Sequence, residues 1–361
     1  MKTKNLNSMK RSLWILGLFV FLSLILIGCN SDTENNASSG EGTEDVEETE
    51  NENTEGSNEK PKEEQVEFPT RPIDLIVPWA SGGSSDLTAR GLSEILSDKL
   101  DHSVNVTNQE GANGTVATTD FATGAASDGH EVLLDASGVM TAQPHLRDVQ
   151  YEPSDFRGVV GLTEEPVVMA VNAESDWETL DDLIEEKDSD KEINFGHSGA
   201  GGFPHVTQEA FFNQAGIDAE SVPHKGGGPA VTALLGGHID TVAAHPAELL
   251  PHVESGDLRL LGVFSKERFD VIEDVPTFEE KGFDINMSVW KFLLVHKDTS
   301  DVILEELRNI FGDAVESSEY SDFLDENNLE AIDIEPEEIV PRLEEELEST
   351  GEILNEINLE E

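Results

Sequence analysis

Glycine residues gather at four places in the chain, and these clusters contain the groups best suited to bind a ligand. The clusters are Ser81-Gly82-Gly83-Ser84, Gly111-Ala112-Asn113-Gly114, Ser198-Gly199-Ala200-Gly201-Gly202 and Lys225-Gly226-Gly227-Gly228. Glycine allows tight turns, and a helix that starts after such a turn presents N–H groups without intrahelical partners. These N–H groups and serine hydroxyls donate hydrogen bonds to anions. The pattern therefore predicts an anion site, with the loops at 81–84 and 198–202 as its main contacts.

Several side chains near the clusters could complete this site. Asp86 could cap the helix after the first cluster or contact an amine or a water molecule. Trp79 could cover an apolar part of the ligand or pack in the core, and Ser137-Gly138 follows another predicted strand toward the same crevice. Lys225 is the cation beside a glycine cluster, where it could pair with a ligand carboxylate or balance acidic neighbours. Among the histidines, we choose His245 for a contact in the cleft.

One cluster also resembles a catalytic motif. Gly196-His197-Ser198-Gly199-Ala200 is close to a nucleophile elbow, which needs a strand, a sharp turn at the serine and then a helix. A cell-surface α/β hydrolase would combine Ser198 with Asp240 and His245. Alanine replaces the last glycine of the motif, however, and Pro204 indicates that the helix starts later. We therefore expect a binding protein without catalysis, and keep the hydrolase as the alternative.

Metal and nucleotide sites have weaker support in the sequence. The second half of the chain contains the histidines His197, His205, His224, His238 and His245. Their spacing matches no compact zinc motif, and the sequence has neither HExxH nor paired CxxC. Walker A and GxGxxG motifs are absent as well. We expect no metal and no cofactor.

The glycine clusters follow strand-like stretches, so an α/β scaffold must position them. Strand-like and helix-like patterns alternate along the chain. The strand-like stretches include 73–80, 103–108, 131–137 and 192–198, and the helix-like ones include 86–100, 114–125, 203–216, 301–315 and 336–357. This alternation predicts an α/β fold with largely parallel sheets, in which loops at the carboxyl ends of strands form the ligand crevice.

The N-terminus predicts export and attachment to lipid. Four cations among the first eleven residues precede an apolar run at 13–27, which is short for a membrane span. The run ends at Cys29, the only cysteine, and resembles a bacterial lipobox. We predict a signal peptide at 1–28 and lipidation, such as palmitate, on Cys29. A plain secretory signal with an incidental cysteine is the alternative.

Acidic residues dominate the remainder of the chain. Residues 30–67 contain fourteen Asp or Glu against two Lys, and with Cys29 they are predicted to form a disordered tether at 29–67. The whole chain has a formal net charge of −54, which opposes nucleic-acid binding. Our hypothesis is an acidic surface suited to an extracellular environment of high salt, where screening makes such charge tolerable.

Five ordered blocks, at 72–90, 104–138, 193–212, 222–265 and 274–290, resemble a known family. They are similar to the substrate-binding proteins of tripartite tricarboxylate transporters, also called Bug receptors. The resemblance covers about 72–297. The chain departs from the common family pattern at three positions: His224 replaces a tyrosine, Trp79 a frequent phenylalanine, and Ala244 a residue that is often polar or acidic.

The resemblance implies a two-lobed, type II periplasmic-binding-protein-like fold with the ligand between the lobes. Lobe 1 would comprise 68–166 and 288–361, and lobe 2 would comprise 167–287. The ligand would be a di- or tricarboxylate, which a monomeric receptor delivers to membrane permease subunits. The implied contacts are Trp79, Ser81, Gly82, Gly83, Ser84, Asp86, Ser137, Gly138, Ser198, Gly199, Ala200, Gly201, Lys225 and His245. Alternatives are a same-fold receptor for an amino acid or aromatic acid, or presentation of the ligand to a sensor kinase.

Overall fold

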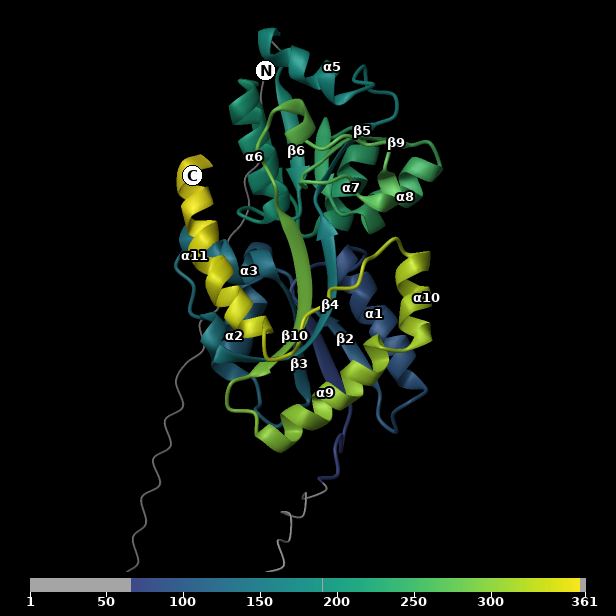
Figure 1. The fold of residues 1–361 in the computed structure, drawn as a ribbon, viewed down its shortest axis with the longest axis vertical. Coiled ribbons are helices and arrows are strands. Elements are labelled where there is room, and N and C mark those ends of the chain that lie inside the picture. The colour runs from purple at the N-terminus through teal and green to yellow at the C-terminus, as the bar shows by residue number, and fades with distance from the viewer. Residues whose placement is uncertain (1–65, 190, 358–361) are drawn as a thin grey trace, which may run out of the picture. The chain divides into compact units, whose positions relative to one another are not determined.

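The computed structural model describes residues 66–189 and 191–357, whose longer strands form two sheets of five strands each (Figure 1). The predicted signal peptide, Cys29 and most of the acidic tether lie outside the described residues. Each sheet has helices on both faces and forms one lobe of a two-lobed α/β fold, which confirms the predicted fold class. No helix among the described residues is long and apolar enough to cross a membrane.

The first lobe contains strands from both ends of the described chain. Its sheet has the order β2-β1-β3-β10-β4, and these strands are β1 (Ile73–Val77), β2 (Val104–Asn108), β3 (Glu131–Ala136), β4 (Phe156–Pro166) and β10 (Ser288–His296). Its helices are α1 (Ser84–Ser97), α2 (Thr115–Gly124), α3 (Ser137–Thr141), α4 (Gln143–Leu146), α9 (Asp301–Val315), α10 (Ser318–Glu326) and α11 (Ile339–Ile357).

The second lobe is built from the middle of the chain. Its sheet has the order β7-β6-β8-β5-β9, with β5 (Val168–Asn172), β6 (Ile193–His197), β7 (Ala219–Pro223), β8 (Thr241–Ala244) and β9 (Leu258–Val263). Its helices are α5 (Leu180–Glu185), α6 (Phe203–Ala215), α7 (Gly227–Leu235) and α8 (Pro246–Glu254). Short 3₁₀ helices are η1 (Ala112–Gly114), η2 (Pro153–Asp155), η3 (Glu186–Asp188), η4 (Asp270–Ile272) and η5 (Glu279–Lys281).

Our expectation of largely parallel sheets is wrong. β1 pairs in parallel with β2 and β3, and β6 pairs in parallel with β7 and β8. However, β10 is antiparallel to β3 and β4, and β5 is antiparallel to β8 and β9. The reason is topological. β5 and β10 are the strands that enter a lobe from the seam between the two, so they start where their neighbours end.

Both faces of each sheet are buried, because neighbouring residues of a strand point to opposite sides. In β3, Leu134 packs with the core residues of α1 and α9, whereas the adjacent Leu133 packs with those of α2, α3 and α11. In β5, Met169 packs with the α6 side and Val168 with the α7 and α8 side. This double burial explains the nearly continuous apolar runs of the strands.

The helix α11 extends from the first lobe to the second. Its residue Leu343 packs in the core of the first sheet, while Leu354 joins the cluster that contains Phe211 of α6. Figure 1 shows α11, in yellow, running from beside β10 towards α6. The C-terminal helix therefore packs against both lobes.

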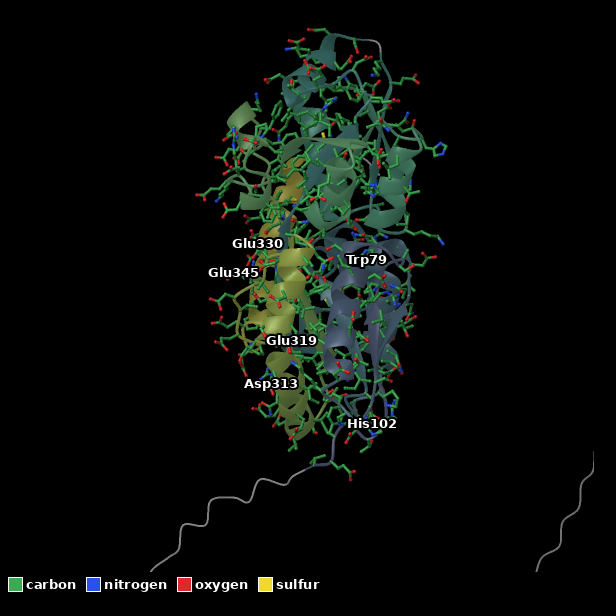
Figure 2. All side chains as sticks on the ribbon, turned by 90° about the vertical axis from the view of Figure 1, so that its right-hand side faces the viewer. Trp79, His102, Asp313, Glu319, Glu330 and Glu345 are labelled. Carbon is green, nitrogen blue, oxygen red and sulfur yellow. The ribbon has the colours of Figure 1, made fainter. Side chains whose placement is uncertain are left out.

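The outer faces of the C-terminal helices and of the segment between α10 and α11 expose carboxylates. Asp313 of α9, Glu319 of α10 and Glu345 of α11 are exposed and point outwards in Figure 2, as does Glu330 in that segment. Water solvates such side chains, so they require no cationic partner. The stripes of apolar residues on these helices, such as Leu304 and Leu307, face the core.

Candidate ligand-binding cleft

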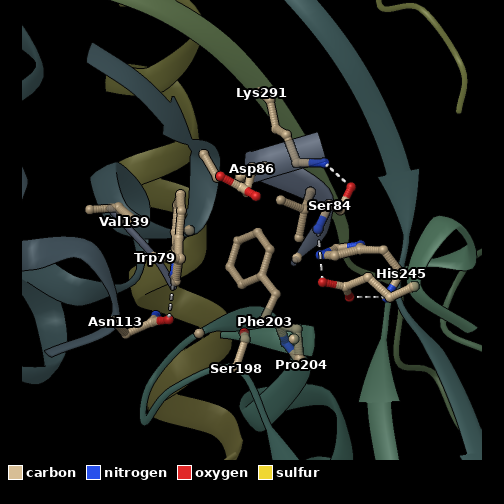
Figure 3. A pocket seen from close by; sticks show the side chains of 18 of the residues that line it. Trp79, Ser84, Asp86, Asn113, Val139, Ser198, Phe203, Pro204, His245 and Lys291 are labelled. Carbon is tan, nitrogen blue, oxygen red and sulfur yellow. Dashed lines mark hydrogen bonds between the residues drawn. The ribbon is translucent and has the colours of Figure 1, made fainter. Parts of the chain in front are cut away.

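A cavity of about 50 Å³ lies at the seam between the lobes (Figure 3). The lobes lie against one another around it, because the Ala80 N–H donates a hydrogen bond to the Lys225 carbonyl across the seam. Apolar and polar side chains of both lobes form its wall. The first lobe lines it with Trp79, Ala80, Gly83, Ser84, Ser85, Asp86, Asn113, Ala136, Gly138, Val139, Val289 and Lys291, and the second with Ser198, Gly202, Phe203, Pro204, Gly227, His245 and Glu248.

The structure brings half of the predicted contacts to this cavity and places the remainder elsewhere. Those that line it are Trp79, Gly83, Ser84, Asp86, Gly138, Ser198 and His245. Trp79 and Ser198 also line a neighbouring cavity of about 270 Å³, together with Gly199, Ala200 and Lys225. Ser81 and Gly82 are exposed, and the buried Ser137 hydroxyl accepts a hydrogen bond from the Trp290 N–H at 3.3 Å. Gly201 packs against Leu146 and Gln143.

The four glycine clusters meet in pairs across the seam. The first cluster faces the fourth: a Cβ atom on Gly228 would lie 2.6 Å from the carbonyl oxygen of Gly82. The second cluster faces the third: a Cβ atom on Gly202 would lie 2.7 Å from the amide nitrogen of Asn113. The contact at Gly228 is with backbone and leaves no room for a larger residue, whereas the contact at Gly202 is with the Asn113 side chain. The clusters therefore allow the backbones of the two lobes to approach one another in the closed state.

Hydrogen bonds join the lobes at the same places. The Ala80 N–H donates to the Lys225 carbonyl at 3.0 Å, and the Arg147 guanidinium donates to the Ala200 carbonyl at 3.0 Å. The Lys225 ammonium forms an ion pair with Glu110 of the first lobe. Lys225 therefore already has a carboxylate partner, and its side chain is 73% exposed.

A buried ion pair lies beneath the cavity. Lys291 of β10 pairs with Glu165 of β4, and the Ser84 hydroxyl donates to Glu165 at 2.7 Å. Burial alone would raise the pKa of Glu165, but the positive charge of Lys291 and the hydrogen bonds outweigh it, and the pKa lies below its ordinary value. Glu165 is therefore ionised, and it uses the one lysine that lines the cavity.

The side chain of Glu248 extends from α8 into the seam between the lobes. One oxygen accepts a hydrogen bond from the Ser84 N–H at the start of α1, at 2.9 Å. The other oxygen accepts from the N–H of His245, the residue that caps α8, at 3.0 Å. The anion-binding groups that the sequence offers to a ligand at Ser84 are thus partly used by the protein itself (Figure 3).

Asp86 has a structural role, but it is not the predicted cap of α1: the cap residue is Gly83, and Asp86 lies in the first turn of the helix. It accepts hydrogen bonds from the Gly82 N–H at 2.9 Å and from Asn108 at 3.0 Å, and it pairs with Arg90 one turn further along the helix. Burial by itself would raise the pKa of Asp86. The hydrogen bonds from Arg90 and Gly82 lower the pKa by more than burial raises it, so it lies below its ordinary value. Asp86 holds the first glycine loop in place and still borders the cavity.

The histidines of the second lobe do not form a metal site. Burial lowers the pKa of His197 to about 3 and that of His205 to about 4, so both rings are neutral at ordinary pH. The two rings lie next to each other, tilted by 43°, with centroids 4.4 Å apart. Among the described residues, no three His, Cys, Asp or Glu side chains gather as metal ligands.

The residues of the alternative catalytic triad are separated. Asp240 accepts a hydrogen bond from the Asn194 N–H near the start of β6, whereas Ser198 follows the end of that strand. The His245 ring lies 3.3 Å from the carbonyl oxygen of Pro166. A triad needs a base within hydrogen-bond reach of the nucleophile and an acid behind the base, and this geometry offers no such chain.

The residues that decide the charge of the cavity, Lys291, Glu165 and Glu248, are not among the contacts predicted from the sequence. Lys291 was detectable, because it interrupts a strand in which Val289, Trp290 and Phe292 are buried. A buried lysine requires a carboxylate partner. Glu165 and Glu248 gave no comparable signal, since their partners are distant in sequence. Asn113 and Phe203, which also line the cavity, resemble ordinary residues of a turn and a helix start.

Comparison with known proteins agrees with this geometry. Residues 88–359 match the family model described as "Tripartite tricarboxylate transporter family receptor" (TctC). The chain belongs to the TctC family. Among curated relatives, Protein BugT of Bordetella pertussis is 32% identical over 255 residues, which cover 69% of this chain and 78% of BugT.

Solved structures of related proteins have the same architecture. A structure described as a periplasmic transporter is 29% identical, with a TM-score of 0.76, and the match covers 81% of this chain and 99% of that one. MatC of Rhodopseudomonas palustris, solved with bound malate, is 26% identical, with a TM-score of 0.74 and coverage of 80% and 100%. These matches confirm the resemblance to the TctC and Bug receptors.

Proposed function

We propose that this protein is an extracytoplasmic receptor that binds a small organic carboxylate between its lobes and delivers it to the permease of a tripartite tricarboxylate transporter. The observation that carries the proposal is the cavity at the seam. Residues from the starts of α1 and α6 line the same small space, together with Ser85 and Ser198. Helix starts and hydroxyls are suitable donors for a carboxylate.

The ligand class follows from the family and from this lining. Family membership favours a di- or tricarboxylate, and the malate bound by MatC supports a small carboxylate. Trp79 and Phe203 face the cavity in Figure 3 and would cover the carbon skeleton of the ligand. The number of carboxylates depends on the charge already present in the cavity.

The cellular location forms part of the proposal. A receptor that serves a membrane permease must stay near the membrane after export. Lipidation of Cys29, followed by the acidic segment at 30–67, would keep the binding lobes close to the permease.

A thermal-shift measurement on the mature chain tests the proposal. A ligand that binds only the folded protein raises the melting temperature with increasing concentration. We expect a shift from at least one carboxylate among mono-, di-, tri- and aromatic acids, and no shift from the corresponding neutral amide. Silence from every carboxylate, with a response to a neutral amino acid amide or to zinc, would overturn the proposed ligand class.

Delivery to the permease needs a separate assay. Uptake of the identified carboxylate into membrane vesicles that contain the permease should require the receptor. A ligand-bound receptor that leaves uptake unchanged, but alters the activity of a sensor kinase, would assign the protein to signalling instead.

A further inference from the structure

Three helix starts converge on the carboxylate of Glu248. Its oxygens accept from the Ser84 N–H of α1 and from the His245 N–H of α8. They also lie directly against Gly227, at the start of α7, where a Cβ atom would collide with the carboxylate. Positive ends of helices stabilise an anion at such a point. The seam therefore already contains one carboxylate whose two oxygens are both hydrogen-bonded, and this carboxylate belongs to the protein.

The other charged groups at the cavity are paired. Asp86 forms an ion pair with Arg90 at 2.8 Å, and Lys291 is held by Glu165 beneath the cavity. Among the described residues, Glu248 has no cationic partner in the structure. Hence no lysine or arginine that lines this cavity is free to neutralise additional negative charge.

We propose that Glu248 restricts the ligand to a single carboxylate, which makes the protein a receptor for small monocarboxylates. This inference rests on the proposed function. One ligand carboxylate can face the remaining N–H groups of α1 and the Ser198 hydroxyl on the opposite wall. A second carboxylate at the end of this cavity where α1, α7 and α8 begin would lie close to Glu248 without a cation of its own, and like charges repel strongly where water is excluded.

The remaining walls of the cavity agree with an uncharged second end. Val139 and Val289 of the first lobe and Phe203 and Pro204 of the second lobe line it. Phe203 projects between Trp79 and His245 in Figure 3. A ligand oriented with its carboxylate towards Ser198 would place a compact alkyl or aryl group against these side chains. Glu248 would select against a charged group there, which is specificity by repulsion.

Calorimetric titration of the mature chain at constant ionic strength tests this inference. The probes are two matched pairs, butyrate with succinate and benzoate with terephthalate, because the members of each pair differ mainly in a second carboxylate. We expect the monocarboxylate of at least one pair to bind about tenfold more tightly than its partner. In Glu248→Gln, we expect this preference to fall by a similar factor, chiefly because the dicarboxylate binds better.

The matched control is Glu254→Gln. Glu254 is exposed at the other end of the same helix, so this variant changes the net charge equally but leaves the cavity intact. It should keep the wild-type preference. The comparison within the wild-type protein needs no variant, so it decides the question even if Glu248→Gln folds poorly.

The outcomes distinguish the inference from the proposed function. Tighter binding of a dicarboxylate by the wild-type chain would overturn the inference and leave a carboxylate receptor. Equal weakening of both members of a pair in Glu248→Gln would assign Glu248 a positioning role and also overturn the inference. Binding of no probe would overturn the inference, and the thermal-shift panel with its tricarboxylates would decide the proposed function.

Discussion

Lys291 of β10 and Glu165 of β4 form an ion pair whose side chains are 1% and 0% exposed, on the two strands by which the chain crosses between the lobes. The Ser84 hydroxyl accepts from the Lys291 ammonium at 2.6 Å, so the start of α1 is attached to both crossing strands. This pair forms the floor of the cavity between the lobes without contributing a free charge to it.

Replacing Lys291 should therefore destabilise the protein strongly. Lys291→Met leaves Glu165 buried without a cation, which typically costs about 3–5 kcal/mol. Urea unfolding measures the loss. The control is Lys297→Met, which breaks an ion pair to Asp155 whose lysine is 50% exposed, and it should cost far less because water already solvates that lysine. Equal losses of unfolding free energy in the two variants would show that the buried ion pair stabilises the protein no more than the exposed one.

Asp135 should make the stability depend on pH in an unusual direction. Burial raises its pKa from 3.8 to about 7, so the folded state keeps a proton that the unfolded state releases above pH 4. The contribution of Asp135 to stability therefore falls as pH rises from about 4 to about 7, by at most ~1.4 kcal/mol per pH unit.

Asp135→Asn tests this sign. Its amide oxygen can accept from the Ala136 N–H, and its NH₂ group can donate to the Thr118 hydroxyl. Guanidinium unfolding at several pH values should show the variant gaining stability over wild type between pH 4 and 7, with little change above 7. A constant difference across that window would refute the raised pKa.

Gly228→Ala should prevent full closure of the lobes. The new methyl group would meet the Gly82 carbonyl oxygen across the seam. Because this contact lies between the lobes rather than inside one, we expect little loss of stability but a larger radius of gyration in small-angle X-ray scattering. An unchanged scattering curve would show that the seam adjusts easily.

Gly312→Ala is the opposite case and should stabilise the protein. Gly312 lies within α9, and a Cβ atom there would meet nothing within 4 Å. Alanine is favoured over glycine inside helices by about 0.5–1 kcal/mol. Thermal and urea unfolding should both show the gain, and a loss would indicate a neighbour that the open space does not reveal.

Cys29→Ser should release the receptor from the membrane. Metabolic labelling with palmitate should mark the wild-type chain and not the variant, and fractionation should move the variant from the membrane to the soluble fraction. Labelling that survives the substitution would assign the lipid, if any, to another group.

Local patterns in the sequence were sufficient for most elements. The apolar run that starts at Ile73 became β1, and the stretch at 301–315 matches α9, because burial of one or both faces enforces a period in the sequence. Strand direction was missed, since β5 and β10 are reversed by the chain path and not by their own residues.

The cavity was less predictable for a related reason. Ser84 and Ser198 are close to glycines in sequence, so they could be proposed for the site. Glu165 and Glu248 join Ser84 from 81 and 164 residues away, and no local pattern reports such a contact. The role of the glycine clusters was predicted only in part. Glycine allows the backbone to come close to a ligand and equally to the backbone of another lobe, and the sequence pattern is the same in both cases.

The direct pairing of Pro166 with Ser288 in the β4–β10 ladder has a practical consequence for separating the lobes. Residues that face one another in an antiparallel ladder lie only about 5 Å apart. The chain thus leaves the first lobe and returns to it at adjacent points, so the second lobe is an insertion in the first. A short loop could join β4 to β10, and the segment 167–287 could be expressed alone or circularly permuted. Ligand titration of each separate lobe and of the complete protein would then divide the binding free energy into the part that one lobe supplies and the part that closure of the two lobes adds.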